Sequence, residues 1–438
     1  MSQKRSPGRR RGILVARIGL VLVALLVSLG LAEIGARMVP PNLSTLGDDG
    51  TDPNDALWSD PDWRSPPPRT FEPDPVLAFA HAPNQTADIP IGEHPRKKYK
   101  YHTNNYGLRK DTDIEIQKPA GTYRVLVLGD SQTGGYVDNA DSYTSLLEDR
   151  WQARASGVKV ETLNAGIIGY APQQEYYWYL TRGRSLQPDL VVLSLYVGND
   201  MRDMVDGEVD AALIDEEAGL IGPLKTPLAW LGLHSELARM SFTAARTVPI
   251  RGLLTALGWR TPAPPPSFEV DALVRVLREC HGCWLQTLKQ AMRARQEPER
   301  FELAYRRLGT MLQLLDAHVR ADGGKLAVMV IPSKPQVEPE DEGGGLRRAL
   351  RLLEVPPEDA EYDDVSRERM LAAVRAANIP LIDPLTELQE AGAEDKKNAR
   401  IFYRRDWHLN IRGNQVVSEI LDTRLTELGL APPGVTVP

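Results

Sequence analysis

Short, continuous apolar segments constrain the fold of this chain more than any other feature of its sequence. Residues 124–128 (RVLVL), 190–196 (LVVLSLY) and 326–331 (LAVMVI) have the pattern of strands that are buried on both faces. Residues 158–163 and 380–382 predict two further strands. Segments with helical spacing of apolar residues separate them. Strands that alternate with helices indicate a parallel sheet covered on both faces.

We therefore expect a three-layer α/β/α domain over residues 123–430, with a five-stranded parallel sheet of the flavodoxin-like type. The strand order stays open at this point. A long stretch at about 201–324 follows the third strand and predicts a helical insertion. Residues 76–122 predict an N-terminal flap on the domain. Helices are predicted near residues 143–151, 172–180, 227–244, 270–296, 300–320, 366–377 and 413–428.

Polar residues stand where several of these strands end, which is where ligand sites lie in open parallel sheets. Ser131 follows the first strand in Gly-Asp-Ser, Gly169 follows the second, and Asn199 follows the third in Gly-Asn-Asp. Asp406 and His408 precede the last predicted helix. A serine becomes a nucleophile when a base removes its proton and a third group orients that base. Backbone and side-chain N–H groups nearby are candidate donors of an oxyanion hole.

Each of these residues also has a simpler structural interpretation. Ser131 is a suitable helix cap, Asn199 suits a turn that starts a helix, and His408 would be an ordinary surface histidine. The spacing Asp-x-His occurs a second time at Asp316 and His318. There it falls in a helical pattern, where residues two apart face different directions. We interpret that second pair as structural.

The blocks around these residues resemble those of the SGNH hydrolases, also called GDSL-like lipases and esterases. The resemblance covers about residues 123–428, with four blocks in the family's order, and it implies a three-layer α/β/α fold. The broad family more often has two residues between Asp and His, whereas here only Trp407 intervenes. In an extended segment the two side chains would still point the same way. The residues implied are the nucleophile Ser131, its partners His408 and Asp406, and the oxyanion donors Ser131, Gly169 and Asn199.

Two further segments resemble a membrane-anchored bacterial branch of this superfamily, namely residues 105–109 (NYGLR) and 331–334 (IPSK). Lys334 falls at the end of a predicted strand, where it would either contact an anionic or polyhydroxyl substrate or be solvated. We expect neither a metal nor another cofactor. The acidic residues near the site are interpreted as caps and turns: Asp130, Asp138, Asp141, Asp200 and Asp203.

The N-terminal segment is set apart from the predicted domain. Residues 1–12 form a basic leader. Within residues 13–39, an apolar run from Ile13 to Ala32, interrupted only by Arg17, approaches the roughly 20 residues that span a bilayer. We favour a transmembrane signal anchor over a cleaved or twin-arginine export signal and over a buried core helix. Residues 40–75, rich in Pro, predict an extended linker. The positive-inside rule then puts the N-terminus in the cytoplasm and the rest of the chain outside. With the resemblance to a bacterial branch, this implies a single-pass protein of the bacterial inner membrane, with its catalytic domain on the periplasmic or outer face.

Cys280 and Cys283 are the only cysteines of the chain. In an oxidising compartment the simplest interpretation is a small structural disulfide between them. Free thiols and redox or metal chemistry are the alternatives. The net charge of −7, without a basic stripe beyond the leader, argues against nucleic acid as the main partner.

These features predict a serine esterase or acyltransferase that works through an acyl-enzyme on an extracytoplasmic ester, either an O-acylated glycan or a lipid. Whether water or a sugar hydroxyl accepts the acyl group stays open, because both reactions use the same residues. The alternative is a non-catalytic glycan-binding protein of the cell envelope on the same scaffold. Its mark in the sequence would be the loss of a triad residue, and none is lost.

Overall fold

The computed structural model of the chain describes residues 70–74, 76–206, 290–291, 293–338, 362–393, 400–404 and 406–437. The predicted anchor, most of the linker and of the insertion, and both cysteines lie outside these described residues. Within the described ranges, no helix combines the length and the apolar character that a membrane span requires.

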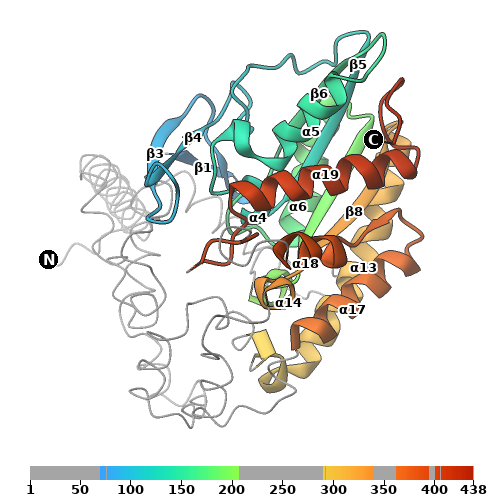
Figure 1. Cartoon of the computed structure of the whole chain (residues 1–438). Helices are drawn as coiled ribbons and strands as arrows, with labels where there is room; N and C mark the ends of the chain where they lie inside the picture. The colour runs from blue at the N-terminus through green and yellow to red at the C-terminus, as the bar shows by residue number, and fades with distance from the viewer. Residues whose placement is uncertain are drawn as a thin grey trace, which may run out of the picture. The chain divides into compact units, whose positions relative to one another are not determined.

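A five-stranded parallel sheet forms the centre of the domain (Figure 1). All five predicted strands are confirmed, and their order is β6-β5-β7-β8-β9. Counted within the sheet this is 2-1-3-4-5, the flavodoxin-like order. The strands are β5 (Thr122–Gly129), β6 (Lys159–Asn164), β7 (Leu190–Tyr196), β8 (Lys325–Ile331) and β9 (Leu381–Ile382).

The strand order determines where a site can form. From β5 the chain moves outward to β6, and it then returns past β5 to begin β7 on the other side. The connections after β5 and β6 therefore run in opposite directions. Such a reversal leaves a crevice at the carboxyl ends of the neighbouring strands. Here the reversal lies between β5 and β7, the strands that precede Ser131 and Asn199.

Helices cover both faces of the sheet, because successive strand residues point to opposite sides. Leu126 and Leu128 pack with α6, α7, α13 and α17 on one face, whereas Val125 and Val127 pack with α5, α18 and α19 on the other. The helices are α4 (Ser131–Gly134), α5 (Tyr143–Gln152), α6 (Pro172–Thr181), α7 (Asp200–Asp206), α13 (Pro298–Ala321), α14 (Lys334–Val337), α17 (Tyr362–Ala376), α18 (Leu385–Ala393) and α19 (Ile411–Glu427).

The segment ahead of β5 forms two antiparallel hairpins that the sequence analysis did not resolve. The first pairs β1 (Phe71–Asp74) with β2 (Ala78–His81), and the second pairs β3 (Thr86–Pro90) with β4 (Lys98–His102). Tyr99 and Tyr101, on the inner side of β4, are fully buried in a third apolar cluster with residues that flank the candidate site. The predicted boundary between linker and flap at residues 75 and 76 is therefore wrong, because β1 already pairs with β2 from Phe71 on. We call residues 71–121 the flap.

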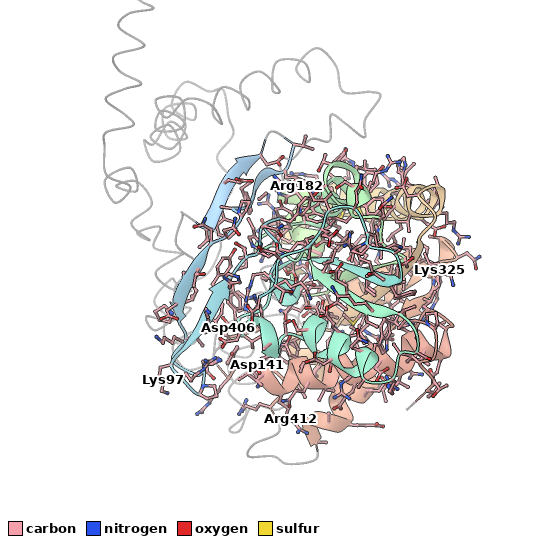
Figure 2. All side chains as sticks on the ribbon, turned by 90° about the horizontal axis from the view of Figure 1, so that it is seen from above. Lys97, Asp141, Arg182, Lys325, Asp406 and Arg412 are labelled. Atoms are coloured by element: carbon pink, nitrogen blue, oxygen red, sulfur yellow. The ribbon has the colours of Figure 1, made fainter. Side chains whose placement is uncertain are left out.

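The flap lies at the side of the domain that carries the candidate site. Figure 2 shows Asp406 beside the flap strands, whereas Lys325, at the amino end of β8, lies at the opposite side. The carboxyl edge of the parallel sheet therefore lies on the side of the domain where the flap is.

Candidate active site

Ser131 lies at the junction where β5 turns into α4. Gly129 ends the strand, and Asp130 caps the helix by accepting a hydrogen bond from the backbone N–H of Gln132 at 2.8 Å. The capping role expected for Asp130 is confirmed. Ser131 is therefore the first residue of α4 and is 7% exposed. Its position beyond the end of a central strand places its hydroxyl at the crevice of the sheet.

The structure brings Ser131, His408 and Asp406 together in one hydrogen-bonded chain. His408 Nε2 lies 2.8 Å from Ser131 Oγ, and His408 Nδ1 lies 2.5 Å from Asp406 Oδ1. His408 is 3% exposed, so its hydrogen bonds to Ser131 and Asp406 are largely shielded from water. Burial alone would raise the pKa of Asp406, but the charge of His408 and its hydrogen bonds hold that pKa below its usual value. The carboxylate is therefore the favoured form beside the imidazole.

The short spacing between Asp406 and His408 is accommodated by a bend rather than by the expected extended segment. Asp406 Oδ1 accepts a hydrogen bond from the backbone N–H of His408 at 2.7 Å, as well as from the ring. An aspartate that bonds the backbone two residues later closes an Asx turn. The turn folds the carboxylate back over the imidazole, so one intervening residue is sufficient.

A hairpin over residues 401–410 carries this bend. Phe402 and Leu409 form a β-bridge, and Tyr403 N–H donates to the carbonyl of His408 at 3.0 Å. Lys334 contacts the other side of the hairpin, where its ammonium donates to the carbonyls of Tyr403 and Arg404 at 2.7 and 2.6 Å.

Lys334 is only 6% exposed, so the expectation that it is solvated is wrong. Two of its three ammonium donors bind backbone carbonyls, and a contact with a substrate stays a prediction. In this fold Lys334 braces the hairpin that holds His408.

The loop after β6 packs directly against α4. A Cβ atom on Gly166 would lie 2.2 Å from the backbone nitrogen of Gly134, so only glycine fits there. Asn164 joins the same two segments, because its side chain accepts from Gly166 N–H at 3.0 Å and donates to the Thr133 carbonyl at 2.9 Å. Gly169 follows in this loop at φ +80°, a left-handed conformation that favours glycine.

Asn199 lies directly before α7, so the helix-start interpretation is correct for its backbone. Its carboxamide donates to Asp203 Oδ2 at 2.5 Å. A primary amide has two N–H groups, so one donor remains for another acceptor.

Three buried carboxyl groups lie on the elements that carry these residues. Burial raises the pKa of Asp130 to about 6, and burial together with Asp130 raises those of Glu175 and Asp200 well above the usual range. Both carboxyl oxygens of Glu175 lack a hydrogen-bond partner among the described residues. Glu175 was missed at the sequence level, because an acid in the first turn of a helix usually indicates a solvated dipole interaction.

Tyr136 and Arg109 extend the site toward the flap. The ring of Tyr136 packs edge-on against His408 with centroids 4.0 Å apart. Arg109 is 2% exposed and donates to the carbonyls of Gly134 and Val137 at 2.7 and 2.9 Å. The segment that follows α4 is thereby fixed from the flap side. The motif NYGLR contains Arg109, but no signal in the sequence pointed to Tyr136.

The second Asp-x-His pair lies away from this constellation. Asp316 and His318 are both in α13, and Asp316 accepts from Arg320 Nε one helical turn later at 2.8 Å. The predicted helix at this position is confirmed. In the part of the chain that the structure describes, no group of three or more His, Cys, Asp or Glu side chains is arranged to hold a metal ion.

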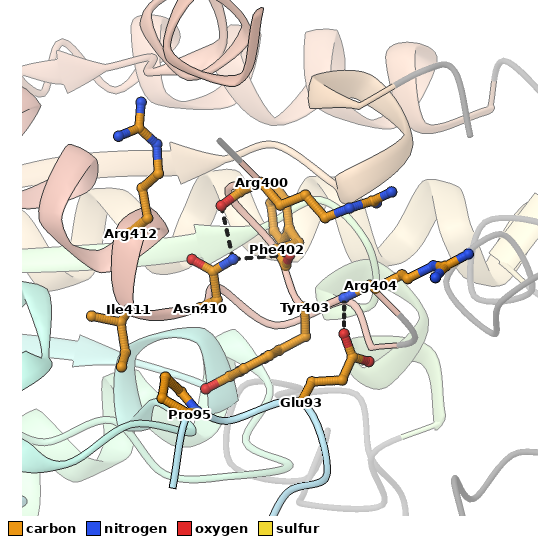
Figure 3. Close-up of a pocket in the computed structure, with 9 residues that line it drawn as sticks. All are labelled: Glu93, Pro95, Arg400, Phe402, Tyr403, Arg404, Asn410, Ile411 and Arg412. Atoms are coloured by element: carbon orange, nitrogen blue, oxygen red, sulfur yellow. Dashed lines mark hydrogen bonds between the residues drawn. The ribbon is translucent and has the colours of Figure 1, made fainter. Parts of the chain in front are cut away.

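A cavity of about 270 Å³ lies on the outer side of the 401–410 hairpin (Figure 3). Ser131 and His408 are not among its lining residues. Figure 3 shows that the guanidinium group of Arg412 points away from those of Arg400 and Arg404, so these cations do not converge on one point. The lining consists of Glu93, Pro95, Arg400, Phe402, Tyr403, Arg404, Asn410, Ile411 and Arg412.

A protein-family model matches the C-terminal part of the chain. The model described as "SGNH hydrolase-like domain, acetyltransferase AlgX" matches residues 281–433. The matched stretch contains Asp406 and His408, whereas Ser131 lies ahead of it. No curated protein matches the chain.

Several solved structures are similar to the chain. LAE5, an α/β hydrolase enzyme from the metagenome of Lake Arreo, Spain, is 13% identical, with 70% of this chain and 96% of LAE5 covered and a TM-score of 0.36. Axe2, an acetylxylan esterase from Geobacillus stearothermophilus, is 9% identical, with 69% and 94% covered and a TM-score of 0.35. TesA is 15% identical, with 70% and 99% covered and a TM-score of 0.35.

The family match and the fold agree on one assignment. The match covers the C-terminal part of the domain, and the Gly-Asp-Ser and Gly-Asn-Asp blocks stand at the carboxyl ends of β5 and β7 ahead of it. Residues 281–433 are therefore similar to an SGNH hydrolase-like domain, and the Ser131–His408–Asp406 arrangement supports an enzyme that acts on ester bonds.

Proposed function

We propose that the chain cleaves or transfers an acyl group through an acyl-enzyme on Ser131. The Ser131 oxygen attacks the ester carbonyl carbon while its proton passes to His408 Nε2, 2.8 Å away. The tetrahedral intermediate collapses, the C–O bond to the leaving alcohol breaks, and His408 returns the proton to that oxygen. Water or a second hydroxyl then attacks the acyl-enzyme, and His408 again accepts and returns one proton.

Asp406 would stabilise this cycle in two ways. Its bond to Nδ1 at 2.5 Å selects the tautomer whose Nε2 is free to accept the serine proton. Its carboxylate then lies beside the imidazolium that forms. The low pKa of Asp406 supports this role, because the carboxylate stays charged while His408 takes up a proton.

The carbonyl oxygen of the substrate becomes an anion in the intermediate and needs donors. We assign this role to the backbone N–H groups of Ser131 and Gly169 and to the free amide hydrogen of Asn199. Each donor of this kind contributes about 2.7–4 kcal/mol to the transition state. The three residues lie on α4, the loop after β6 and the end of β7, which meet at the crevice of the sheet.

We propose an O-acylated glycan outside the cytoplasm as the substrate, in preference to a lipid. The name of the matching family, an acetyltransferase, supports acetyl transfer to or from a hydroxyl group. The basic leader and the apolar residues 13–39 support a membrane-anchored, extracytoplasmic protein. The choice between hydrolysis and transfer is decided by the acceptor, so products should be measured with and without an oligosaccharide acceptor.

The hydrogen-bonded chain from Ser131 through His408 to Asp406 carries this proposal, and Ser131→Ala tests it. The variant should lose turnover of p-nitrophenyl acetate and labelling by a fluorophosphonate, because no hydroxyl remains to form the acyl-enzyme. Ser418→Ala is a matched control, since Ser418 is also buried but lies in α19. Wild-type turnover by Ser131→Ala, with the label on another serine, would contradict the proposal. A folded wild-type protein that binds glycans but shows neither turnover nor labelling would favour the non-catalytic alternative.

A further inference from the structure

Gln132, the residue after the candidate nucleophile, reaches across to the hairpin that carries His408. Its side chain is 1% exposed. The amide nitrogen donates to the carbonyl of Trp407 at 3.0 Å, and the amide oxygen accepts from the N–H of Leu409 at 3.2 Å. Trp407 and Leu409 are the residues on either side of His408. One carboxamide therefore holds the backbone before and after the base.

The chemistry of the two partners fixes the orientation of this side chain. An amide nitrogen only donates and an amide oxygen only accepts. The hairpin offers one carbonyl and one N–H in the complementary arrangement. Rotation of the carboxamide by half a turn would set donor against donor and acceptor against acceptor, so Gln132 is locked in a single position.

Ser131 and His408 are separated by 277 positions in the sequence, so only tertiary contacts bring them to hydrogen-bonding distance. The bonds of Gln132 are such contacts, and they begin one residue from the serine and end one residue from the histidine on each side. A misplacement of about 1 Å between reacting groups lowers a rate by about a hundredfold. The bonds of Gln132 therefore help to fix the distance between Ser131 Oγ and His408 Nε2.

We propose that Gln132 is a positioning residue of the catalytic centre, which keeps His408 Nε2 in line with Ser131 Oγ without touching the substrate. The inference rests on the proposed acyl-enzyme function. This role explains why the buried position after Ser131 is occupied by the polar residue Gln132. An apolar residue of the same size would fill the space but would leave the backbone of Trp407 and Leu409 without these partners.

The test compares Gln132→Met with the control Asn104→Leu. Methionine keeps the length of the side chain but makes neither bond. Asn104 is also 1% exposed, and its carboxamide accepts from the backbone N–H groups of Tyr106 and Leu108 at 3.0 and 3.1 Å within the flap. Both variants lose buried backbone bonds. Gln132→Met should lower kcat for p-nitrophenyl acetate by about ten- to a hundredfold with little change in KM. Asn104→Leu should keep kcat within about twofold of wild type.

A double-mutant cycle with His408→Ala separates positioning from general support of the fold. If Gln132 acts through His408, Gln132→Met has no further effect on the residual rate of the His408→Ala enzyme. A purely structural residue would lower the rate in both backgrounds. Gln132→Glu, which keeps an acceptor for Leu409 N–H but sets an oxygen against the Trp407 carbonyl, serves the same comparison if Gln132→Met does not fold.

The inference is overturned if Gln132→Met retains wild-type kcat, if both carboxamide variants lose activity equally, or if the effect persists beside His408→Ala. Its failure is distinguishable from failure of the proposed function. Ser131→Ala must abolish turnover for the acyl-enzyme proposal to stand, whatever Gln132→Met does. A slower fluorophosphonate labelling of Ser131 in Gln132→Met would support the inference without relying on turnover.

Discussion

Asp406→Asn removes one negative charge from the centre while it keeps the size of the side chain. In the structure Asp406 Oδ1 accepts two hydrogen bonds from His408, one from the backbone at 2.7 Å and one from the ring at 2.5 Å. An asparagine whose oxygen stays in place keeps both bonds as neutral ones. An asparagine that turns its NH₂ group toward Nδ1 forces the proton onto Nε2, which then cannot accept the proton of Ser131.

The expected magnitude follows from these two cases. In the first, the imidazolium loses a charge-assisted bond of up to about 3 kcal/mol, which corresponds to about a hundredfold in rate. In the second, the wrong tautomer lowers kcat by about 10⁴, as the corresponding change does in serine proteases. We therefore expect kcat to decrease by a factor of about 10² to 10⁴. KM should change little, because Asp406 need not touch the substrate.

The assay is steady-state hydrolysis of p-nitrophenyl acetate, combined with thermal unfolding of each variant. Asp316→Asn is the matched control, because it changes the same residue type in the other Asp-x-His pair, within α13. It should leave kcat unchanged. A loss of less than about tenfold by Asp406→Asn, at an unchanged melting temperature, would refute the orienting role of Asp406 and would leave a dyad of Ser131 and His408.

Three other outcomes follow from the structure and the sequence. Burial raises the pKa of Glu175, so the folded protein holds a proton that the unfolded chain releases and loses stability as the pH rises above the usual carboxyl range. Glu175→Gln should therefore melt higher than wild type at about pH 8 and equally at about pH 4, and equal melting at both would contradict the raised pKa. Gly166→Ala should inactivate and destabilise the enzyme, because its Cβ would lie 2.2 Å from Gly134 N, whereas Gly309→Ala, in an open position of α13, should be tolerated. A reporter fused after Pro438 should be active only outside the cytoplasm, and cytoplasmic activity would overturn the predicted topology.

The sheet and most helices of the described domain could be predicted from the sequence because their signals are local. Strands such as 190–196 are apolar at nearly every position, since β7 is buried on both faces. The flap strands were missed although residues 98–102 alternate in the sequence, with Tyr99 and Tyr101 on one side. A short alternating segment does not by itself predict a strand, because the strand forms only when another segment pairs with it.

The candidate site was predictable as far as it depends on residue types at strand ends. Ser131 lies beyond the end of β5 as expected, and Asp406 and His408 meet it from the hairpin that precedes α19. The supporting residues were not predictable. Lys334 and Gln132 act through hydrogen bonds to backbone groups. The residue type alone predicts neither the partner nor the direction of such a bond.

The distance in sequence between the serine and its base has a consequence for biosynthesis. At about 5–20 residues per second, a ribosome needs roughly 14 to 55 seconds to extend the chain from Ser131 to His408. Throughout that interval the nascent chain carries the serine without the group that activates it. The order of the blocks thus leaves the serine without its base until the 401–410 hairpin has been made, so under the proposed function a product that ends before that hairpin cannot form the acyl-enzyme.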